Sequence, residues 1–362
     1  MLILSNQDIA RLLDVRSCIE ALRKGYNDLA AGDAAYIPRI DLYAPTGRKE
    51  DYYRWGSMSG VSRSHGVTAV RMKSDIVFWP DGKTEDKYCK EPGTYCGLIL
   101  LFSISTAEPL ALLQDGYLQH LRVGASAALG ADLLARKDAE TLGMLGSGGM
   151  ARTYLEAICA VRQIRVCNVY SPTAAHRESY AREMSQKLGI EVVPVDRAED
   201  AVRNCDIVAT TTNSLQPTFA AEWVSPGTHL TCVSRRELSD EVFDRVDVAV
   251  QLGYNTILRQ SSIPGMHWLQ GGFASYICGQ PEERNILPPA RSVESRQFPT
   301  LMDLVKGRYP GRTSSDQISF FITTGTQGLQ FAAVGGYVLQ RAKELGLGTQ
   351  IPDSWFLQDI KD

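Results

Sequence analysis

A glycine-rich turn stands between an apolar stretch and a helix-forming stretch at residues 141–152, which read TLGMLGSGGMAR. Gly146, Gly148 and Ala151 give this turn the pattern Gly-x-Gly-x-x-Ala. Such a turn points free backbone N–H groups and the positive end of a helix at one place, where a pyrophosphate can bind without a charged side chain. We therefore expect a dinucleotide to contact Gly146, Ser147, Gly148, Gly149, Met150 and Ala151.

The motif alone is equally typical of an ordinary glycine-rich loop, so the sequence around the turn must distinguish the two interpretations. A strand-like stretch at residues 164–170 follows after a helix-length segment, so strand, turn, helix and strand fit within the roughly 30 residues of one βαβ unit. Further strand-like stretches lie at residues 191–195, 206–212, 228–233 and 247–250. Strands that alternate with helices predict an α/β, Rossmann-type domain that binds a nucleotide at the carboxyl ends of parallel strands.

Several cations interrupt apolar stretches in the N-terminal part of the chain. Arg39 follows a proline, Arg71 and Lys73 lie inside VRMKSD, and Arg122 lies among small and apolar residues in LRVGASAALG. A cation in such surroundings must find an anion or remain costly. For any one of these residues, a salt bridge within the chain is the simpler explanation. Several of them beside a dinucleotide site favour a substrate that carries a carboxylate.

The N-terminal part combines helix and strand signals, which predict an α+β domain. Ser5 with Asp8 predicts a capping box, and Asp14 predicts the cap of a helix over residues 15–31. Strand-like stretches follow at residues 52–58, 67–72 and 97–103. A long amphipathic helix over residues 117–134 then leads to the dinucleotide-binding strand, and we place the domain boundary within or just after it.

Beyond the last predicted strand the signals are weaker. Residues 253–312 are rich in Gly, Pro and Gln and predict loops with short helices. Trp268 and Phe273 in this segment could shape a pocket, although such aromatic residues more often belong to a core. A helix is predicted over residues 326–345 with Gly346 as its C-cap, and the closing DSWFLQDIKD is expected to pack back on the first domain.

Composition narrows the classes of function. The chain has 362 residues, a net charge of -3 and no block of lysine and arginine, which argues against nucleic acid as a partner. No apolar run has membrane-spanning length, and the N-terminus lacks a signal-peptide pattern, so we expect no membrane partner. Scattered cysteines without a C-x-x-C pair predict free thiols and a cytoplasmic protein, and the dispersed histidines predict no metal site.

Several stretches resemble signatures of the ornithine cyclodeaminase and mu-crystallin family, which also includes an alanine dehydrogenase and cyclic-imine reductases. They read GTYCGLILLFSISTAEPLALL, LRVGASAALGADLLAR, TLGMLGSGGMAR, and GRTSSDQISFF followed by GLQFAAVGGYVLQRAKELGLG. The resemblance implies a Rossmann domain, residues 129–312, inserted in a substrate-binding and dimerisation domain formed by residues 1–128 and 313–362. It also implies a homodimer.

The resemblance implies roles for individual residues. Arg39 and Arg122 match arginines that hold the substrate carboxylate, and Thr94 matches an active-site threonine. The family's lysine falls in VRMKSD, where position along the motif selects Arg71 and chemical identity selects Lys73; we choose Lys73. On the cofactor side, the implied contacts beyond the glycine-rich turn are Ser126, Thr212 and Val233.

The chain departs from the cyclodeaminases after the strand at residues 228–233. In those enzymes this strand is followed by a loop with a catalytic aspartate and then by a Glu-Leu pair, whereas here CVSR runs directly into Arg236-Glu237-Leu238. The lyase reaction depends on this acid–base group, which this chain lacks. A one-way reduction of an imine needs only a held carboxylate, a hydride donor and a proton source such as Lys73 or water.

A second departure concerns the choice of cofactor. An acidic residue at the end of the second Rossmann strand would bind the ribose 2′-hydroxyl and repel a 2′-phosphate. This chain instead has hydroxyl groups and a cation there, from Ser171, Thr173 and Arg177. The sequence therefore favours NADP(H), and a neutral pocket that also accepts NAD(H) is the alternative.

These observations predict an NAD(P)H-dependent reductase of an imine, or of a 2-oxo acid plus an amine, that gives an amino acid or a cyclic amino acid. One alternative is a lyase that deaminates and cyclises ornithine or lysine with tightly bound NAD. A third possibility is a mu-crystallin-like protein that binds NADPH and a small ligand with little turnover.

Overall fold

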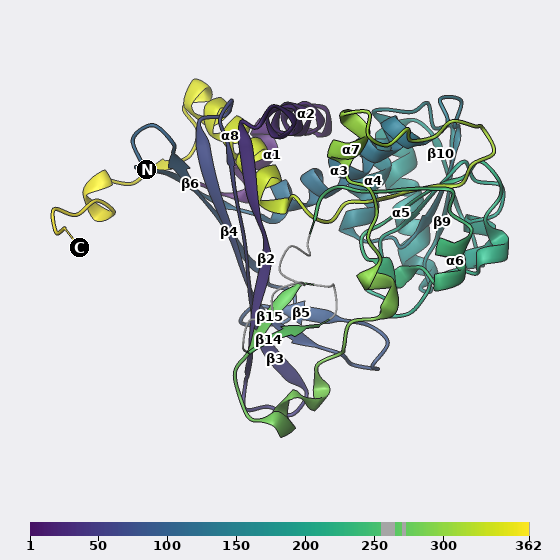
Figure 1. Ribbon diagram of the computed structural model, residues 1–362, viewed down its shortest axis with the longest axis horizontal. Helices are drawn as coiled ribbons and strands as arrows, with labels where there is room; N and C mark the ends of the chain where they lie inside the picture. The colour runs from purple at the N-terminus through teal and green to yellow at the C-terminus, as the bar shows by residue number, and fades with distance from the viewer. Residues whose placement is uncertain (255–264, 270–272, 362) are drawn as a thin grey trace.

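The chain forms two domains, each with one β-sheet and helices that pack against it (Figure 1). The structure is a computed structural model that describes residues 1–254, 265–269 and 273–361. The predicted Rossmann-type domain is confirmed, because the second sheet is wholly parallel and most of its strands alternate with helices. Within the described residues, no helix is long and apolar enough to cross a membrane.

The first domain is built on a ten-stranded mixed sheet with the order β14-β15-β2-β3-β4-β6-β7-β1-β17, in which β5 pairs with β4. Its strands are β1 (Leu2–Leu4), β2 (Ala34–Pro45), β3 (Asp51–Ser62), β4 (Val67–Phe78), β5 (Asp86–Tyr88), β6 (Cys96–Ser103), β7 (Pro109–Gln114), β14 (Met266–Trp268), β15 (Ala274–Ile277) and β17 (Thr349–Gln350). Helices α1 (Asn6–Leu12), α2 (Val15–Ala31) and α8 (Gln327–Leu345) belong to the same domain. Capping boxes at Ser5 and Asp14 start α1 and α2, and Gly346 ends α8 with a φ of 62°, all as predicted.

The second domain is a seven-stranded parallel sheet with the order β10-β9-β8-β11-β12-β16-β13. Its strands are β8 (Thr141–Leu145), β9 (Val166–Tyr170), β10 (Glu191–Pro194), β11 (Ile207–Thr210), β12 (His229–Cys232), β13 (Val248–Gln251) and β16 (Ser319–Ile322). The helices are α4 (Gly149–Cys159), α5 (Ala174–Leu188) and α6 (Asp240–Asp244), and α7 (Leu301–Val305) lies between the domains in the chain. Because β8 is an interior strand, the third in this order, the glycine-rich turn that follows it lies between its neighbours at the carboxyl edge of the sheet.

Helix α3 (Gly116–Leu134) joins the two domains, and the prediction that it is amphipathic is wrong. Every residue from Leu121 to Ala131 is buried. One side of the helix, with Ala125 and Ala128, belongs to the core of the first domain, and the other side, with Ala127 and Ala131, belongs to the core of the second. A helix buried between two cores needs no polar face.

The two faces of the first sheet differ in an unusual way along β4. The inward residues of this strand include the charged series Arg71, Lys73 and Asp75, all of them buried. The outward residues include Val70 and Met72, which are partly exposed. Side chains alternate between the faces of a strand, so the charged residues face the second domain while an apolar surface faces away.

The predicted domain boundaries fall at the wrong places. β16 was assigned to the first domain, but it pairs with β12 and β13 of the second sheet. β14 and β15 were assigned to the second domain, but β15 pairs with β2 of the first sheet. Strand pairing over such distances along the chain has no local signal, which is why the boundaries could not be read from the turns.

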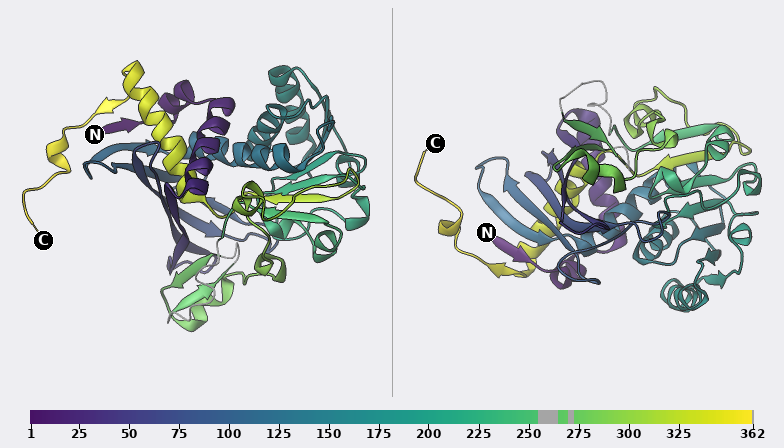
Figure 2. Two further views of the ribbon diagram at one scale, coloured as in Figure 1. Left: turned by 45° about the horizontal axis from the view of Figure 1, so that its top comes forward. Right: turned by 90° about the horizontal axis from the view of Figure 1, so that it is seen from below.

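The C-terminal residues also differ from the prediction. They were expected to pack back on the first domain, but beyond β17 the chain runs outward past the N-terminus and away from both sheets (Figure 2). Trp355 and Ile360 are each 74% exposed.

Candidate functional site

The glycine-rich turn has the geometry of a pyrophosphate site. Gly146 has a φ of 108°, and a Cβ atom there would lie 2.9 Å from the carbonyl oxygen of Thr211, so only glycine fits. Gly148 is the N-cap of α4, and no side chain caps this helix. Because the first N–H groups of a helix have no partner within it, those of α4 are available to an anion.

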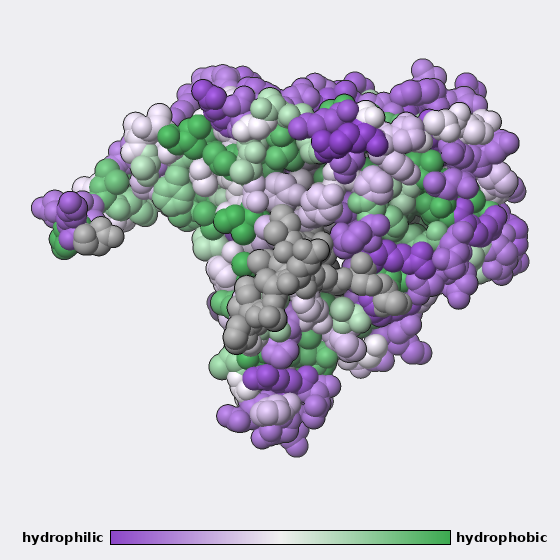
Figure 3. All heavy atoms as spheres, viewed as in Figure 1, coloured by the Kyte–Doolittle hydropathy of each residue, from purple (hydrophilic) through white to green (hydrophobic). Residues whose placement is uncertain are grey.

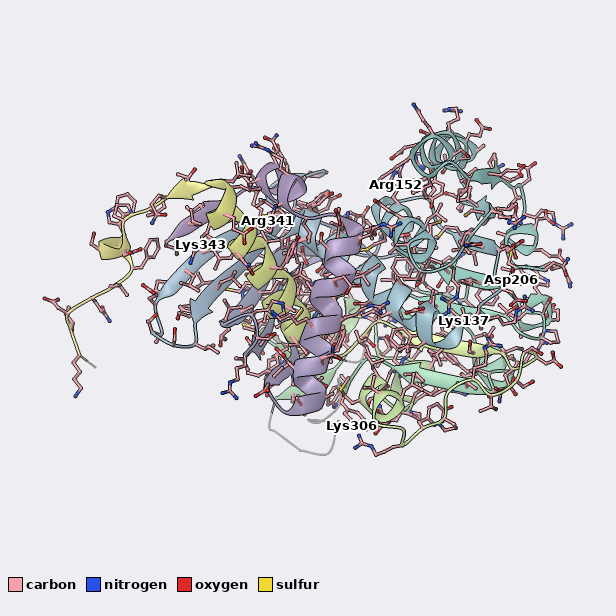
Figure 4. All side chains as sticks on the ribbon, turned by 90° about the horizontal axis from the view of Figure 1, so that it is seen from above. Lys137, Arg152, Asp206, Lys306, Arg341 and Lys343 are labelled. Atoms are coloured by element: carbon pink, nitrogen blue, oxygen red, sulfur yellow. The ribbon has the colours of Figure 1, made fainter. Side chains whose placement is uncertain are left out.

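Other residues of the motif hold this turn in place. Ala151 is fully buried, and its carbonyl oxygen accepts a hydrogen bond from the Tyr180 hydroxyl at 3.0 Å. Arg152 of α4, labelled in Figure 4, donates to the carbonyl oxygen of Ser147 at 2.7 Å. It also forms an ion pair with Glu183. The carbonyl of Ser147 is therefore turned toward α4, consistent with N–H groups that face the opening.

A histidine that the sequence analysis missed lies over the turn. A Cβ atom on Gly149 would lie 2.7 Å from Cε1 of His120, which projects from α3. Desolvation and the positive charge of Lys87 lower the pKa of His120, so its ring is neutral at neutral pH. The absence of a side chain at Gly149 therefore makes room for a neutral imidazole beside the free N–H groups of α4.

A cavity of about 210 Å³ lies between the domains and joins residues from both. Arg39 of β2, Arg122 of α3 and Phe273 line it from the first domain, and Met150 and Val233 line it from the second. Its other lining residues are Gln119, Val123, Ser234, Arg235, Gln251, Gly253, Glu294, Gln297, Ile322, Thr323, Thr324 and Gln327. The cavity thus connects two of the predicted arginines to the predicted cofactor site.

Arg122 is the buried cation of this cavity. Its side chain donates to the amide oxygens of Gln330 and Gln119, each at 2.8 Å, and lies 5.0 Å from the ring centre of Phe331. Burial, and then the nearby guanidinium of Arg71, lower the pKa of Arg122 to about 9. No carboxylate among the described residues forms an ion pair with it. The simpler explanation, a salt bridge within the chain, therefore does not apply to Arg122.

Arg39 does have an internal partner. Its Nε lies 2.7 Å from Oδ1 of Asp41, and its guanidinium lies 4.3 Å from the ring centre of Phe273. Both Arg39 and Phe273 line the cavity, so of the two possibilities left open for Phe273, pocket wall or core, the structure shows a buried ring at the pocket wall. Part of the neighbouring GMHWLQGGF segment, residues 270–272, lies outside the described residues.

Behind Arg39, buried ions of alternating charge follow the inward face of the sheet. Lys73 lies 3.0 Å from Asp75, which also forms an ion pair with Arg54 at 3.2 Å. Arg54 in turn lies 2.9 Å from Glu85. Burial, together with the guanidinium groups of Arg39 and Arg54, lowers the pKa of Lys73 well below its usual range. This ammonium group therefore gives up a proton more readily than an ordinary lysine.

Three predicted residues of the first domain do not line the cavity. Lys73 lies in the buried ion cluster just described. Arg71 donates to Oδ2 of Asp115 at 2.7 Å. Thr94 is exposed on the turn before β6 and donates to the carbonyl oxygens of Cys89 and Glu91. Lys73 lies close enough to Arg39 for the charge of that guanidinium to lower its pKa.

Two hydroxyl groups predicted to contact the cofactor have other partners. Ser126 is fully buried and donates to the carbonyl oxygen of Arg122 at 2.8 Å, within its own helix. The backbone N–H and the hydroxyl of Thr212 both donate to Oε1 of Glu237, at 2.6 and 2.7 Å. Glu237 also accepts from the backbone N–H of Ser234, so it ties together the ends of β11 and β12. Burial raises the pKa of Glu237 to about 7.

The residues predicted to choose between cofactors lie at the end of β9. Arg177 of α5 donates to the carbonyl oxygen of Ser171 at 3.0 Å and forms an ion pair with Asp196. Thr173 is the N-cap of α5, and its hydroxyl caps no N–H group of that helix. The Asp196 side chain is 89% exposed, so solvent screens its attraction for Arg177.

The model of the ornithine cyclodeaminase/mu-crystallin family matches residues 1–344. The chain belongs to this family. Over 254 residues it is 32% identical to a putative dehydrogenase of Rhizobium meliloti, covering 70% of this chain and 72% of that protein. It is 28% identical over 263 residues to a Delta(1)-pyrroline-2-carboxylate reductase of Bacillus cereus, covering 71% of this chain and 74% of that enzyme.

Solved structures agree with this family membership. The Delta(1)-pyrroline-2-carboxylate reductase of Thermococcus litoralis, in complex with NADH and L-proline, has a TM-score of 0.76 and 26% identity, over 97% of this chain and 100% of that one. An archaeal alanine dehydrogenase dimer with bound NAD has a TM-score of 0.73 at 23% identity, over 97% and 99% of the two chains. The second match supports the fold alone.

Replacing Gly146 by alanine tests the pyrophosphate turn. We expect Gly146→Ala to lower the affinity for NADPH and NADH at least tenfold, because the positive φ and the contact with Thr211 together displace the turn. Gly189→Ala is the matched control, since Gly189 also has a positive φ but has open space around it at the end of α5. Titration of cofactor fluorescence measures both affinities. Equal affinities in the two variants would contradict the assignment of the turn.

Proposed function

We propose that this protein is an NAD(P)H-dependent reductase that converts an imine, formed from a 2-oxo acid and an amine, into an amino acid or a cyclic amino acid. The observation that carries the proposal is Arg122, a buried guanidinium in a cavity that also reaches Met150 and Val233 of the cofactor domain. A buried cation without an internal counter-ion is best satisfied by an anionic ligand. Since the cavity connects it to the dinucleotide turn, a substrate carboxylate fits that role.

In this proposal, the two arginines bind the substrate and a lysine provides the proton. Arg122 and Arg39 orient the carboxylate, which holds the carbon atom of the C=N bond against the cofactor side of the cavity. A reduced nicotinamide, when bound at the glycine-rich turn, would supply the hydride. Lys73, with its lowered pKa, lies behind the wall of the cavity and supplies the proton to the imine nitrogen through water. Gln327, which is 5% exposed and whose Oε1 has no hydrogen-bond partner among the described residues, can accept from the substrate N–H.

The relatives support the same class of reaction. Delta(1)-pyrroline-2-carboxylate reductases act on a cyclic imine that carries a carboxylate, and such enzymes occur both among the sequence relatives and among the structures that match over nearly the whole chain. The lyase alternative receives no comparable support from the site, because Arg235 lines the cavity directly after β12, where a cyclodeaminase would need its acid.

NADP(H) is the proposed cofactor, with NAD(H) as the alternative. The end of β9 presents Arg177 and the hydroxyl of Thr173 rather than a carboxylate. A 2′-phosphate could replace the exposed Asp196 as the partner of Arg177, since charge-assisted bonds to phosphate are stronger than a screened surface ion pair.

A homodimer is the proposed assembly, because the outward face of the first sheet is apolar and uncovered. Ile37, Ser59, Val70 and Leu100 form one row across β2, β3, β4 and β6 on this face. Ile37 and Leu42 are 57% and 43% exposed. Figure 3 shows hydrophobic residues gathered on the first domain, whereas the second domain is mostly hydrophilic. A contiguous apolar patch of this kind marks an interface.

Ile37→Glu tests the dimer. A buried glutamate would disrupt a symmetric interface through desolvation and like-charge repulsion, so we expect the variant to sediment near the mass of one 39.9 kDa chain and the parent near twice that mass. Leu133→Glu places the same charge at a position 46% exposed on α3 and should leave the mass unchanged. Analytical ultracentrifugation distinguishes the three proteins. A monomeric parent would rule out the proposed assembly.

Arg122→Gln tests the reductase proposal. Loss of NADPH or NADH absorbance is followed with a panel of cyclic imines and of 2-oxo acids with amines. We expect the variant to lose about 10- to 100-fold in kcat/KM on the best substrate, as for a lost charge-assisted hydrogen bond. Arg341→Gln removes the same charge from the exposed side of α8 and should be neutral (Figure 4). Full activity of Arg122→Gln, or ammonia release from ornithine or lysine with no change in cofactor absorbance, would refute the proposal.

The pH dependence of kcat tests Lys73. In the reduction direction the ammonium form is required, so kcat of the parent should fall as pH rises through the lowered pKa of Lys73, well before an ordinary lysine titrates. Lys73→Met should reduce kcat by about 10²- to 10⁴-fold and abolish this fall. Cofactor affinity, measured by fluorescence, should not change. If Lys73→Met keeps the alkaline limb of the parent, another group donates the proton.

A further inference from the structure

The residues after β17 form a C-terminal arm, residues 351–361, that has an apolar surface. The arm lies beyond residue 344, the last residue that the family model matches. Trp355 and Ile360 are each 74% exposed, and Phe356 and Leu357, which stand between them in the sequence, are exposed as well. Large apolar side chains that are exposed close together mark a surface that binds another molecule.

The base of this arm is fixed in place. The backbone N–H of Ile351 donates to the carbonyl oxygen of Met1 at 2.9 Å, next to the antiparallel pair of β1 and β17. The 3₁₀ turn Asp353–Trp355 follows, and the N–H of Leu357 donates to the carbonyl oxygen of Asp353 at 3.0 Å. The turn keeps the apolar side chains together, and the arm carries them away from both sheets of its own chain (Figure 2).

The outward face of the first sheet continues to the strand from which the arm starts. Leu112 of β7 pairs with Leu100 of β6 on one side and with Ile3 of β1 on the other. Ile3 also pairs with Thr349 of β17. Because cross-strand partners lie on the same face of a sheet, the row that begins at Ile37 of β2 extends across the sheet to the base of the arm.

The opposite side of this face, at β2, has exposed apolar residues that an arm can cover. Ile37 and Leu42 are both exposed, and they pair with Ser59 and Trp55, which lie on one face of β3. When two such faces stack around a two-fold axis parallel to the strands, the β17 edge of one sheet lies over the β2 side of the other. An arm that leaves at β17 then reaches Ile37 and Leu42 of the partner subunit.

We infer that the C-terminal arm of each copy packs on the β2 side of the first sheet of a second copy, so that two arms are exchanged in the dimer. This inference rests on the proposed homodimer and adds a contact to it. A two-fold interface uses the same residues of both subunits, so one exchange covers the apolar residues of both arms and both β2 strands. The second copy is the occupant that the strand pairing favours, because the apolar face of the proposed dimer leads directly to the arm.

A photo-crosslinker in place of Trp355 tests the contact directly. p-Benzoylphenylalanine at this position keeps a large apolar side chain, and dimers are assembled from heavy-isotope-labelled and unlabelled copies. We expect crosslinked peptides that join the two labels, with the attachment sites in β2 or β3. The same crosslinker in place of Leu133, which is exposed on α3, is the control and should join no two chains. If position 355 gives no crosslinks between chains, or gives them only to the second domain of the partner, the inference is wrong.

The dissociation constant of the dimer provides a second test. We expect Trp355→Ser combined with Ile360→Ser to raise this constant at least tenfold, because two large apolar side chains lose their burial against the partner. Val305→Ser, at an exposed position on α7, is the matched control and should leave the constant unchanged. Sedimentation over a dilution series measures the three proteins.

The outcomes distinguish the arms from the dimer and from the reaction. A double variant with the dissociation constant of the parent overturns the exchange of arms and leaves the homodimer intact. A parent that is monomeric over the whole dilution series overturns both. Neither result changes the proposed reduction, which is measured separately through cofactor absorbance.

Discussion

The burial of Arg122 is the constraint on which the arrangement of the two domains depends. Its guanidinium is held by amide oxygens from α3 and α8 and by the ring of Phe331 on α8, so the last long helix of the chain completes a site that α3 begins. These neutral groups solvate the cation without neutralising it, and the remaining attraction is left for a ligand. Since α3 also packs against both cores, a change in its position would move the cation and the cofactor turn together.

The first sheet has charged residues on its inward face and apolar residues on its outward face, and this arrangement also depends on how buried charges are paired. Charged residues on the inward face of β4 can be buried because each has a partner of opposite sign within the cluster, such as Lys73 with Asp75 and Arg71 with Asp115. The outward face is then left with the apolar half of the alternation, including Val70 and Met72. The buried ion cluster inside the molecule and the apolar surface outside it are therefore two results of one strand pattern.

The candidate site could be predicted only where a residue's environment is set by its neighbours in the chain. The turn at Gly146 and the burial of Arg122 could be predicted from local pattern. A glycine in a turn motif indicates a positive φ, and a cation among small and apolar residues indicates burial. Ser126 and Thr212 could not be judged in this way. Their hydroxyl groups are used by the preceding helical turn and by Glu237, and nothing local distinguishes a hydroxyl that faces a ligand from one that does not.

The sequence by itself determined the helices, the parallel strands of the second domain and the dinucleotide turn, because periodicity, capping residues and glycine conformation act over a few residues. Only the tertiary structure decided which strands share a sheet, since β16 and β15 each join strands far away in the chain. It also decided that Arg235 and Phe273 face one cavity with Arg122, and that His120 covers Gly149. These contacts depend on packing between distant segments of the chain, and that packing decides whether a side chain lies in the core, on the surface or in a binding site.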